Sequence, residues 1–167
     1  MTIQIRQARI EDLNSVVAIE LENFSPKEAM SFETLAEHIK KNKTSFLVAE
    51  KDGHILGYLE GPVVPWRYLQ DSSFEQVEDF SHNNGGYISI TSLSISPDAQ
   101  SMGLGKILID RMKEIAQRDG RLGINLTCHD YLITYYEKHG FINEGLSKST
   151  YAGEVWYDLI WEVSRQE

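Results

Sequence analysis

Residues 93–106 read LSISPDAQSMGLGK: an apolar strand, a proline, and then Gly103 and Gly105 ahead of Lys106. Apolar residues recur at helical spacing after this stretch, so the glycines stand where a strand gives way to a helix. Glycine lets another group approach the main chain, and a helix start presents unpaired N–H groups at its positive dipole end. The junction is therefore a candidate site for a phosphate.

Two well-known glycine loops do not fit these residues. A Walker A loop requires a glycine five residues before Gly105 and a hydroxyl residue after Lys106, but the chain has Gln100 and Ile107 there. A dinucleotide-binding loop requires a third glycine where the chain has Leu108. One alternative remains open, in which the glycines only allow a tight turn between strand and helix.

Apolar patterns along the rest of the chain predict seven strands and four helices. The strand-like runs cover residues 2–8, 45–50, 55–61, 87–95, 122–128, 141–149 and 154–163, and the helical runs cover 13–24, 31–39, 104–119 and 132–140. Asp52-Gly53 is a turn signal that joins residues 45–61 into an antiparallel hairpin. Ser31 has the character of an N-cap, and Ser25, Pro26 and Glu28 also have the pattern of a helix start with a capping-box acid.

The order of these elements predicts a mixed α/β fold. We expect a mostly antiparallel central sheet of about seven strands, with about four flanking helices and a parallel pair around the crossover helix 104–119. Residues 66–86 are a long polar stretch without a clean period, and a loop of that length in a compact domain usually covers something. The length favours one domain over residues 1–167.

The formal net charge of −9 predicts an acidic surface that attracts cationic small molecules rather than nucleic acid. The start of the chain has no apolar secretory region, no run is long and apolar enough to span a membrane, and Cys128 is the one cysteine. These features predict a cytoplasmic protein without membrane attachment. The five histidines show no metal-ligand spacing, so no metal is expected. A lone cysteine such as Cys128 is more often a small buried apolar residue than a nucleophile.

Three features together resemble the GCN5-related N-acetyltransferase (GNAT) superfamily. They are the element order, the Gln100-x-x-Gly103-x-Gly105 loop after LSISP, and the motif YYEKHGF at residues 135–141. The segments ENFSPKEAMSF and CHDYLITYYEKHGF, with the long loop before the fourth strand, are most similar to the arylalkylamine N-acetyltransferase group. The resemblance implies the acyl-CoA N-acyltransferase fold, in which a parallel pair of strands splays apart around the coenzyme.

The resemblance also implies which residues bind coenzyme A. Amides of residues 101–106 would hold the pyrophosphate, and the strand end would pair its main chain with the pantetheine arm. Lys106 could add a charge near the phosphates or remain solvated. The expected coenzyme site consists of Leu93, Ser94, Ile95, Gln100, Ser101, Met102, Gly103, Leu104, Gly105 and Lys106.

Tyr136 is the expected general acid, because the family places its acid at this tyrosine. A phenol is suited to protonate a leaving thiolate, since its ordinary pKa is close to that of a thiol. Tyr135 is the neighbouring alternative, and the family pattern favours its packing against the sheet. A simpler possibility is that both tyrosines are core residues with satisfied hydroxyls.

At the expected proton acceptor, the sequence departs from the arylalkylamine group. The animal arylalkylamine enzymes carry two histidines, two residues apart, where this chain has Ser89 and Thr91. Spacing by two keeps both side chains on one face of a strand. Hydroxyls are not bases near neutrality, but they could anchor a water chain that leads to Glu28 or another acid. The alternative is that both are ordinary strand residues.

The sequence thus predicts an N-acetyltransferase that uses acetyl-CoA as cosubstrate and a small primary amine, aromatic or polycationic, as acceptor, in a monomer or homodimer. Acetylation of protein N-termini or lysines, a noncatalytic acyl-CoA-binding module and a domain that binds no coenzyme are the alternatives. Phe24, Trp66, Tyr68, Phe74 and Phe80 could wall an aryl pocket or form a satellite core. The aromatic residues of the last strand region, Trp156, Tyr157 and Trp161, are expected to pack within the sheet.

Overall fold

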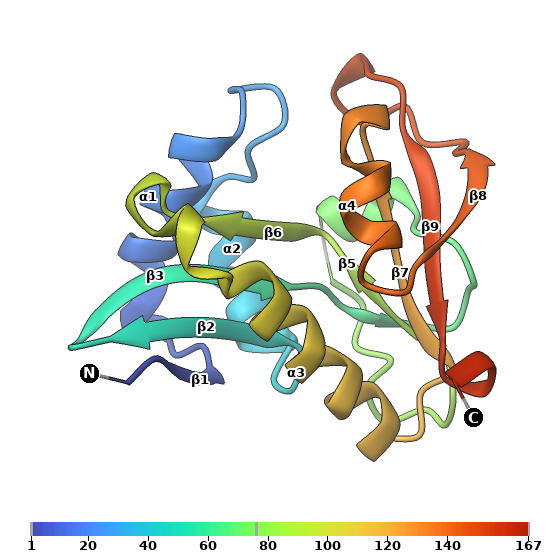
Figure 1. Cartoon of the computed structure of the whole chain (residues 1–167), viewed down its shortest axis with the longest axis horizontal. Coiled ribbons are helices and arrows are strands. Elements are labelled where there is room, and N and C mark those ends of the chain that lie inside the picture. The colour runs from blue at the N-terminus through green and yellow to red at the C-terminus, as the bar shows by residue number, and fades with distance from the viewer. Residues whose placement is uncertain (1, 76, 167) are drawn as a thin grey trace.

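The computed structural model describes residues 2–75 and 77–166 and confirms the mixed α/β fold. Its strands form two sheets. The first has the order β1 (Gln4–Gln7), β2 (Phe46–Lys51), β3 (His54–Glu60) and β6 (Ser92–Ile95), with every pair antiparallel. The second has the order β4 (Val63–Val64), β5 (Tyr87–Ile90), β7 (Gly123–Cys128), β9 (Tyr157–Glu162) and β8 (Ile142–Leu146). Among the strand pairs of the described residues, β5 and β7 form the one parallel pair (Figure 1).

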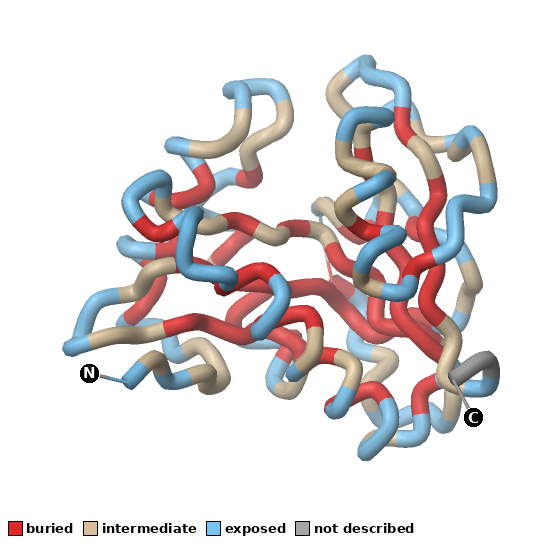
Figure 2. The backbone as a smooth tube through the Cα atoms, in the orientation of Figure 1, coloured by how far each residue is buried: buried red, intermediate tan, exposed pale blue. Residues whose placement is uncertain are grey.

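Four α-helices cover these sheets within the described residues. They are α1 (Leu13–Asn23), α2 (Phe32–Lys41), α3 (Leu104–Arg118) and α4 (Ile133–Glu137). Side chains of β2 and β3 alternate between two cores, because successive residues of a strand point to opposite faces. Leu47 and Leu59 pack with α3, whereas Phe46 and Tyr58 pack with α1 and α2. The buried positions accordingly follow the strands and the inner sides of the helices (Figure 2).

The predicted hairpin is confirmed at its turn. Lys51 pairs with His54, which leaves Asp52 and Gly53 as the two loop residues. Both have positive φ, 53° and 81°, as a type I′ turn requires, and this turn matches the twist of the flanking strands.

The run 87–95 is two strands rather than one. It breaks at Thr91, where β5 leaves the second sheet and β6 joins β3 of the first. The parallel ladder of β5 and β7 ends at Ile90 and Leu126, so the last residues of β7 have no partner on that side. The division, together with the short strand β4, accounts for nine strands where seven were expected. Because β6 and β7 diverge from this point, a wedge opens between the two sheets (Figure 1).

One predicted helix start is wrong. Ser31 does cap α2, and its hydroxyl accepts from the amide of Thr34 at 3.1 Å. At Ser25, however, the chain makes only one turn, in which the amides of Glu28 and Ala29 both donate to the Ser25 carbonyl. The Glu28 carboxylate reaches across to another part of the fold instead of continuing a helix. Within residues 2–75 and 77–166, no helix has the length and apolar character that crossing a membrane requires.

Candidate active site

A cleft of about 570 Å³ occupies the wedge between β6 and β7. Its walls come from α1 and the turn that follows it, from β6 and the first turn of α3, and from β7, α4 and the segment before β9. This volume is in the range of small-molecule sites. Most of the residues predicted to bind the coenzyme line it, together with Thr91 and Tyr136.

The open edge of β6 forms one wall of the cleft. The amide of Ser96 donates to the Leu56 carbonyl at 2.7 Å, which makes this a hydrogen-bonded pair of the antiparallel ladder. Since such pairs alternate along a ladder, the main-chain groups of Leu93 and Ile95 point away from β3. Asn23 of α1 donates to the Ile95 carbonyl at 2.8 Å. The main chain of Leu93 is therefore available to pair with an extended, amide-bearing ligand.

The glycine loop gives the cleft a second wall. Gly103 caps α3 in the left-handed conformation, with φ of 72°, which favours glycine. The first amide that donates within the helix is that of Ile107, to the Gly103 carbonyl at 3.4 Å. The amides of Leu104, Gly105 and Lys106 therefore have no intrahelical acceptor, as expected for a first turn. This set of donors suits a pyrophosphate.

The other residues of the predicted coenzyme site differ in position. Gln100 lines the cleft and donates to the Ile95 carbonyl at 3.4 Å. Lys106 lines the cleft, but its ammonium pairs with Asp110 at 2.7 Å on the exposed face of α3. Ser101 and Met102 do not line the cleft; both lie in the 3-10 helix that precedes Gly103.

Tyr136 lies on α4, where its ring packs edge-on against Tyr135 and Phe141. The residue is buried and its hydroxyl forms no hydrogen bond with the described part of the chain, although it lines the cleft. Burial raises the pKa of the Tyr136 phenol well above its ordinary value. The phenol is therefore protonated at neutral pH and can donate into the cleft.

Tyr135 also reaches the cleft instead of packing only against the sheet. It is half-buried, and its hydroxyl fills the space that a side chain on Gly105 would occupy. A Cβ at Gly105 would clash with that hydroxyl. A side chain at Gly105 would therefore have to displace Tyr135, so glycine allows this part of the first turn to pack closely against α4.

The structure separates the two hydroxyl residues proposed for a proton route. Thr91 lines the cleft and donates to the carboxylate of Glu60 at 2.8 Å. Ser89 is fully buried outside the cleft lining and donates to the Asn125 side chain at 2.5 Å. Their spacing does not keep them on one face, because the chain changes sheets at Thr91. The water chain with Ser89 at its start has no support in this geometry.

Two buried carboxylates adjoin the cleft, Glu20 in its lining and Glu60 behind Thr91. Glu20 accepts hydrogen bonds from the Tyr58 and Ser92 hydroxyls and from the amide of Met30. Burial raises the pKa of Glu20, although these hydrogen bonds oppose the shift. Glu60 accepts from His38, Asn42 and Thr91. Both carboxylates therefore have extensive internal hydrogen bonding.

The opposite end of the cleft has an aromatic wall, of which the sequence analysis named only Phe74 as a pocket residue. The wall consists of Phe74, Tyr151, Trp156, His129 and Tyr131, all of which line the cleft. Successive ring centroids lie 4.1, 6.3, 4.3 and 5.4 Å apart in that order. Tyr131 is 74% exposed, so an aromatic surface is available at the mouth of the cleft.

This wall corrects several expectations about aromatic residues. Phe24 and Phe74 line the cleft as the aryl-pocket hypothesis required, but Trp66, Tyr68 and Phe80 do not. Trp66 instead packs edge-on against Phe80. Trp156 was expected within the sheet, yet it precedes β9 and faces the cleft. The sequence contains one local signal for the wall, the stretch CHDY at residues 128–131. Its polar and aromatic residues follow directly on a buried strand, where functional side chains are often found.

Glu28 connects the aromatic wall to the turn after α1. Its carboxylate contacts the Nε2 of His129 at 2.9 Å, and its main-chain carbonyl accepts from the Tyr151 hydroxyl at 2.8 Å. With Glu20 also in the lining, this end of the cleft carries acidic groups beside aromatic rings. Such a combination suits a cation with an apolar or aromatic body.

Cys128 lines the cleft, but it is poorly suited to nucleophilic attack. Burial, aided by the charge of Asp130, raises the pKa of the thiol to about 12. The reactive form of cysteine is the thiolate, which is scarce at neutral pH when the pKa is that high.

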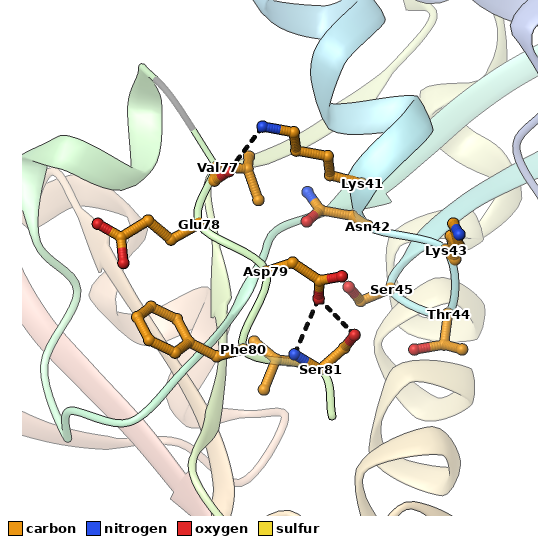
Figure 3. A pocket seen from close by; sticks show the side chains of 11 residues that line it. Lys41, Asn42, Lys43, Thr44, Ser45, Val77, Glu78, Asp79, Phe80 and Ser81 are labelled. Carbon is orange, nitrogen blue, oxygen red and sulfur yellow. Dashed lines mark hydrogen bonds between the residues drawn. The ribbon is translucent and has the colours of Figure 1, made fainter. Parts of the chain in front are cut away.

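A second hollow, between the end of α2 and residues 77–81, is too small for a substrate. Its volume is about 30 Å³, enough for one or two water molecules. Lys41 spans it to the Val77 carbonyl, and Asp79 turns toward Ser81 (Figure 3). Within the described ranges, no group of three or more histidine, cysteine or acidic side chains could hold a metal ion.

Comparison with known proteins places this geometry among acetyltransferases. The sequence model of the "Acetyltransferase (GNAT) family" matches residues 11–141. The chain is 28% identical over 106 residues to the "Probable glucosamine 6-phosphate N-acetyltransferase 2" of Oryza sativa subsp. japonica, a match that spans 63% of this chain and 64% of that protein. It is 23% identical over 153 residues to the N-alpha-acetyltransferase of Sulfurisphaera tokodaii, covering 89% of this chain and 86% of that one.

Solved structures share the fold. The PaiA N-acetyltransferase of Thermoplasma acidophilum, crystallised with coenzyme A, superposes with a TM-score of 0.68 at 20% identity. The superposition covers 97% of this chain and 99% of that one.

Proposed function

The chain belongs to the acetyltransferase (GNAT) family and is an acyltransferase, and from this premise we propose that it transfers an acetyl group from acetyl-CoA to a primary amine. The transfer is a direct attack by the amine in a ternary complex. The observation that carries this proposal is the cleft itself, which gathers the open edge of β6, the first turn of α3 and Tyr136 around one cavity.

The part of the cleft formed by the edge of β6 and the first turn of α3, here called the coenzyme arm, fits the chemistry of coenzyme A. The main chain of Leu93 can pair with the amides of the pantetheine arm, as an added strand pairs with a sheet edge. The amides of Leu104 to Lys106 can hold the pyrophosphate. The substrate supplies its acetyl group as a thioester, and these main-chain contacts fix where that group lies.

Tyr136 is the proposed general acid. Attack on the thioester expels a thiolate, which needs a proton, and the phenol of Tyr136 is protonated and faces the cleft. Direct transfer agrees with the state of Cys128, because a thiol whose pKa is about 12 is a poor nucleophile for a covalent acetyl-enzyme.

The acceptor that the geometry supports best is a small arylalkylamine. Its ring can pack along the aromatic wall from Phe74 to Tyr131, and its ammonium can approach Glu28. A phosphorylated sugar is a poor fit, because the carboxylate of Glu28 would repel its phosphate. A peptide N-terminus is the second candidate, favoured by the similarity to the N-alpha-acetyltransferase of Sulfurisphaera tokodaii.

A thiol-release assay, corrected for hydrolysis of acetyl-CoA, tests the proposal. The panel contains tyramine, tryptamine, spermidine, glucosamine 6-phosphate and short peptides with free N-termini. We expect the highest kcat/KM for the arylalkylamines. Activity restricted to peptides would select the second candidate, and no activity with any amine, despite acetyl-CoA binding by calorimetry, would contradict the proposed transfer.

A further inference from the structure

An acceptor amine must lose a proton before it can attack, since it is mostly ammonium at neutral pH. Ser89 does not reach the cleft, so the pair of hydroxyls suggested by the sequence cannot start the proton route. Four acidic or basic systems remain at the cleft wall: Glu20, Glu60 behind Thr91, His139, and the contact between Glu28 and His129. His139 packs edge-on against Tyr135, beside the first turn of α3, so it lies at the coenzyme side and not at the aromatic wall.

Glu20 and Glu60 hold the fold together rather than facing a substrate. Each is at most 1% exposed and accepts three hydrogen bonds from protein donors that lie in different elements. A new proton on either carboxylate would have to displace one of these donors. Neither group is therefore positioned to take a proton from an incoming ammonium.

His129 differs from them in both access and bonding. Its side chain is 20% exposed, and it lines the cleft directly after β7. The Glu28 carboxylate contacts Nε2, so the neutral ring carries its proton on that nitrogen. The other nitrogen, Nδ1, forms no hydrogen bond with the residues that the structure describes. Its lone pair can thus accept a proton from an ammonium group in the cleft.

The surroundings hold the ring in place and suit its charged form. His129 stacks on Trp156 at a ring angle of 29° and on Tyr131 at 11°. Glu28 is itself held by Ser25, whose hydroxyl donates to it at 3.0 Å. An imidazolium at this position would be stabilised by the carboxylate and by the faces of two electron-rich rings.

We propose that His129 is the general base that deprotonates the acceptor amine, and that Glu28 orients its ring and stabilises the imidazolium. This role rests on the proposed function. It assigns the acceptor class more closely: a cationic primary amine whose ammonium lies beside His129 while its apolar body packs along the aromatic wall.

The proton balance closes without a further reactant. One proton passes from the ammonium to Nδ1 of His129, and the neutral amine then attacks the thioester carbonyl. A new C–N bond forms and the C–S bond breaks. Tyr136 protonates the departing thiolate, and the second proton lost from nitrogen restores the phenol. His129 then releases its proton to solvent.

Several titratable groups surround His129 and can influence the pH dependence of the reaction. Glu28 faces it from the turn after α1, and Tyr151 lies next to both Glu28 and Trp156. Cys128, Asp130 and Tyr131 adjoin it in its own segment. Among these groups, Glu28 is the one that contacts the imidazole through a carboxylate.

The test is the pH dependence of kcat/KM in His129→Gln, because a glutamine amide can still donate to Glu28 but cannot act as a base. We expect a loss of about 100-fold near pH 7 for the best amine of the panel. The loss should shrink as the pH approaches about 10, where the free amine is already neutral. A ratio of wild-type to variant kcat/KM that stays constant with pH, or an unchanged rate, would overturn the proposal.

Further variants distinguish the role of His129 as a base from an effect on folding and from a failure of the proposed transferase activity. Glu28→Gln should show a smaller loss with the same pH trend, and added imidazole should partly restore His129→Gly. His82→Gln is the matched control, since that side chain is 89% exposed and pairs only loosely with Asp79, at 3.7 Å. Equal acetyl-CoA affinity in all variants shows that the fold is intact. A wild-type protein inactive on every amine contradicts the transferase itself, whereas an active wild type with an equally active His129→Gln contradicts only the base.

Discussion

At the scale of single residues, Tyr136 combines burial with access to the cleft. Its phenol is kept protonated because burial raises its pKa, yet the hydroxyl has no acceptor among the described residues. The ring packs in the core, while the residue also borders the cleft. Tyr136 thus fits the proton donor that the proposed transfer requires.

Tyr136→Phe should lower kcat by about 100-fold while the KM for acetyl-CoA changes little, because the ring still packs and only the proton donor is lost. Steady-state kinetics with the best amine measures both constants. Tyr68→Phe serves as the control, since that hydroxyl bonds to Arg67 and Glu144 outside the cleft. A variant with the kcat of the wild type would leave Tyr136 without a catalytic role.

At the scale of elements, the first turn of α3 packs against α4 through the hydroxyl of Tyr135, which lies next to Gly105. The hydroxyl of Tyr135 lies where a side chain on Gly105 would be, while the ring carbon Cζ would stand at an ordinary 3.4 Å from it. Gly105 therefore allows α3 and α4 to approach each other closely. This close approach is separate from the left-handed backbone at Gly103.

Gly105→Ala should weaken acetyl-CoA binding by about tenfold, because a displaced Tyr135 disturbs both sides of the cleft. In the double variant Gly105→Ala, Tyr135→Phe the clashing oxygen is absent, so much of the affinity should return. Isothermal titration with acetyl-CoA measures both. If Gly105→Ala binds as the wild type does, the contact seen here does not shape the coenzyme site.

The helix α2 is tied to β3 by a buried pair, His38 and Glu60, with Nδ1 and Oε1 2.8 Å apart. Burial alone would lower the pKa of His38, but the charge and hydrogen bond of Glu60 raise it above its ordinary value. Since the folded pKa lies above the unfolded one, the pair stabilises the fold fully below about pH 6.5. That stabilisation is lost as the pH rises through the folded pKa.

The wild type should therefore lose stability toward urea between pH 6 and pH 9, to a greater extent than His38→Gln. The variant should be less stable overall and its unfolding free energy should depend less on pH in this window. Equilibrium unfolding at several pH values tests this expectation. If the unfolding free energies of the two proteins change with pH in parallel, protonation of His38 does not cause the pH dependence of stability.

At the scale of the whole molecule, the cleft exists because residues 87–95 pass from the second sheet into the first. The two sheets separate beyond that point. The coenzyme arm belongs to the first sheet and α3, and the aromatic wall belongs to the second sheet and the loops around it. A ligand that fills the wedge contacts both halves. The net charge of −9 adds a field that attracts cations to the molecule as a whole.

Raising the ionic strength from about 0.01 M to about 0.15 M should lower kcat/KM for a cationic amine several-fold, because the screening length falls from about 30 Å to about 8 Å. The value of kcat at saturating amine should stay nearly constant, since steering acts on encounter. Initial rates at saturating acetyl-CoA and varied amine concentration measure both kcat/KM and kcat. An increase of kcat/KM with salt would contradict attraction by the acidic surface.

Local sequence patterns were enough to predict most of the helices and strands, the turn at Asp52-Gly53, the cap at Ser31 and the position of the glycine loop. These features follow from local chemistry: side-chain period, backbone conformations that favour glycine, and orphan amides at a helix start. The resemblance to a known family added the coenzyme, which local patterns alone left open.

Tertiary structure decided the rest. A period of two predicts which side chains share a face only while a strand stays in one sheet, and the change of sheets at Thr91 removed Ser89 from the cleft. The aromatic wall joins Phe74, Tyr131 and Trp156, which no local pattern relates. Glu28 meets His129 only because the diverging sheets bring the turn after α1 over the end of β7. Contacts between residues so distant in sequence depend on how the layers pack, and packing is a property of the whole chain.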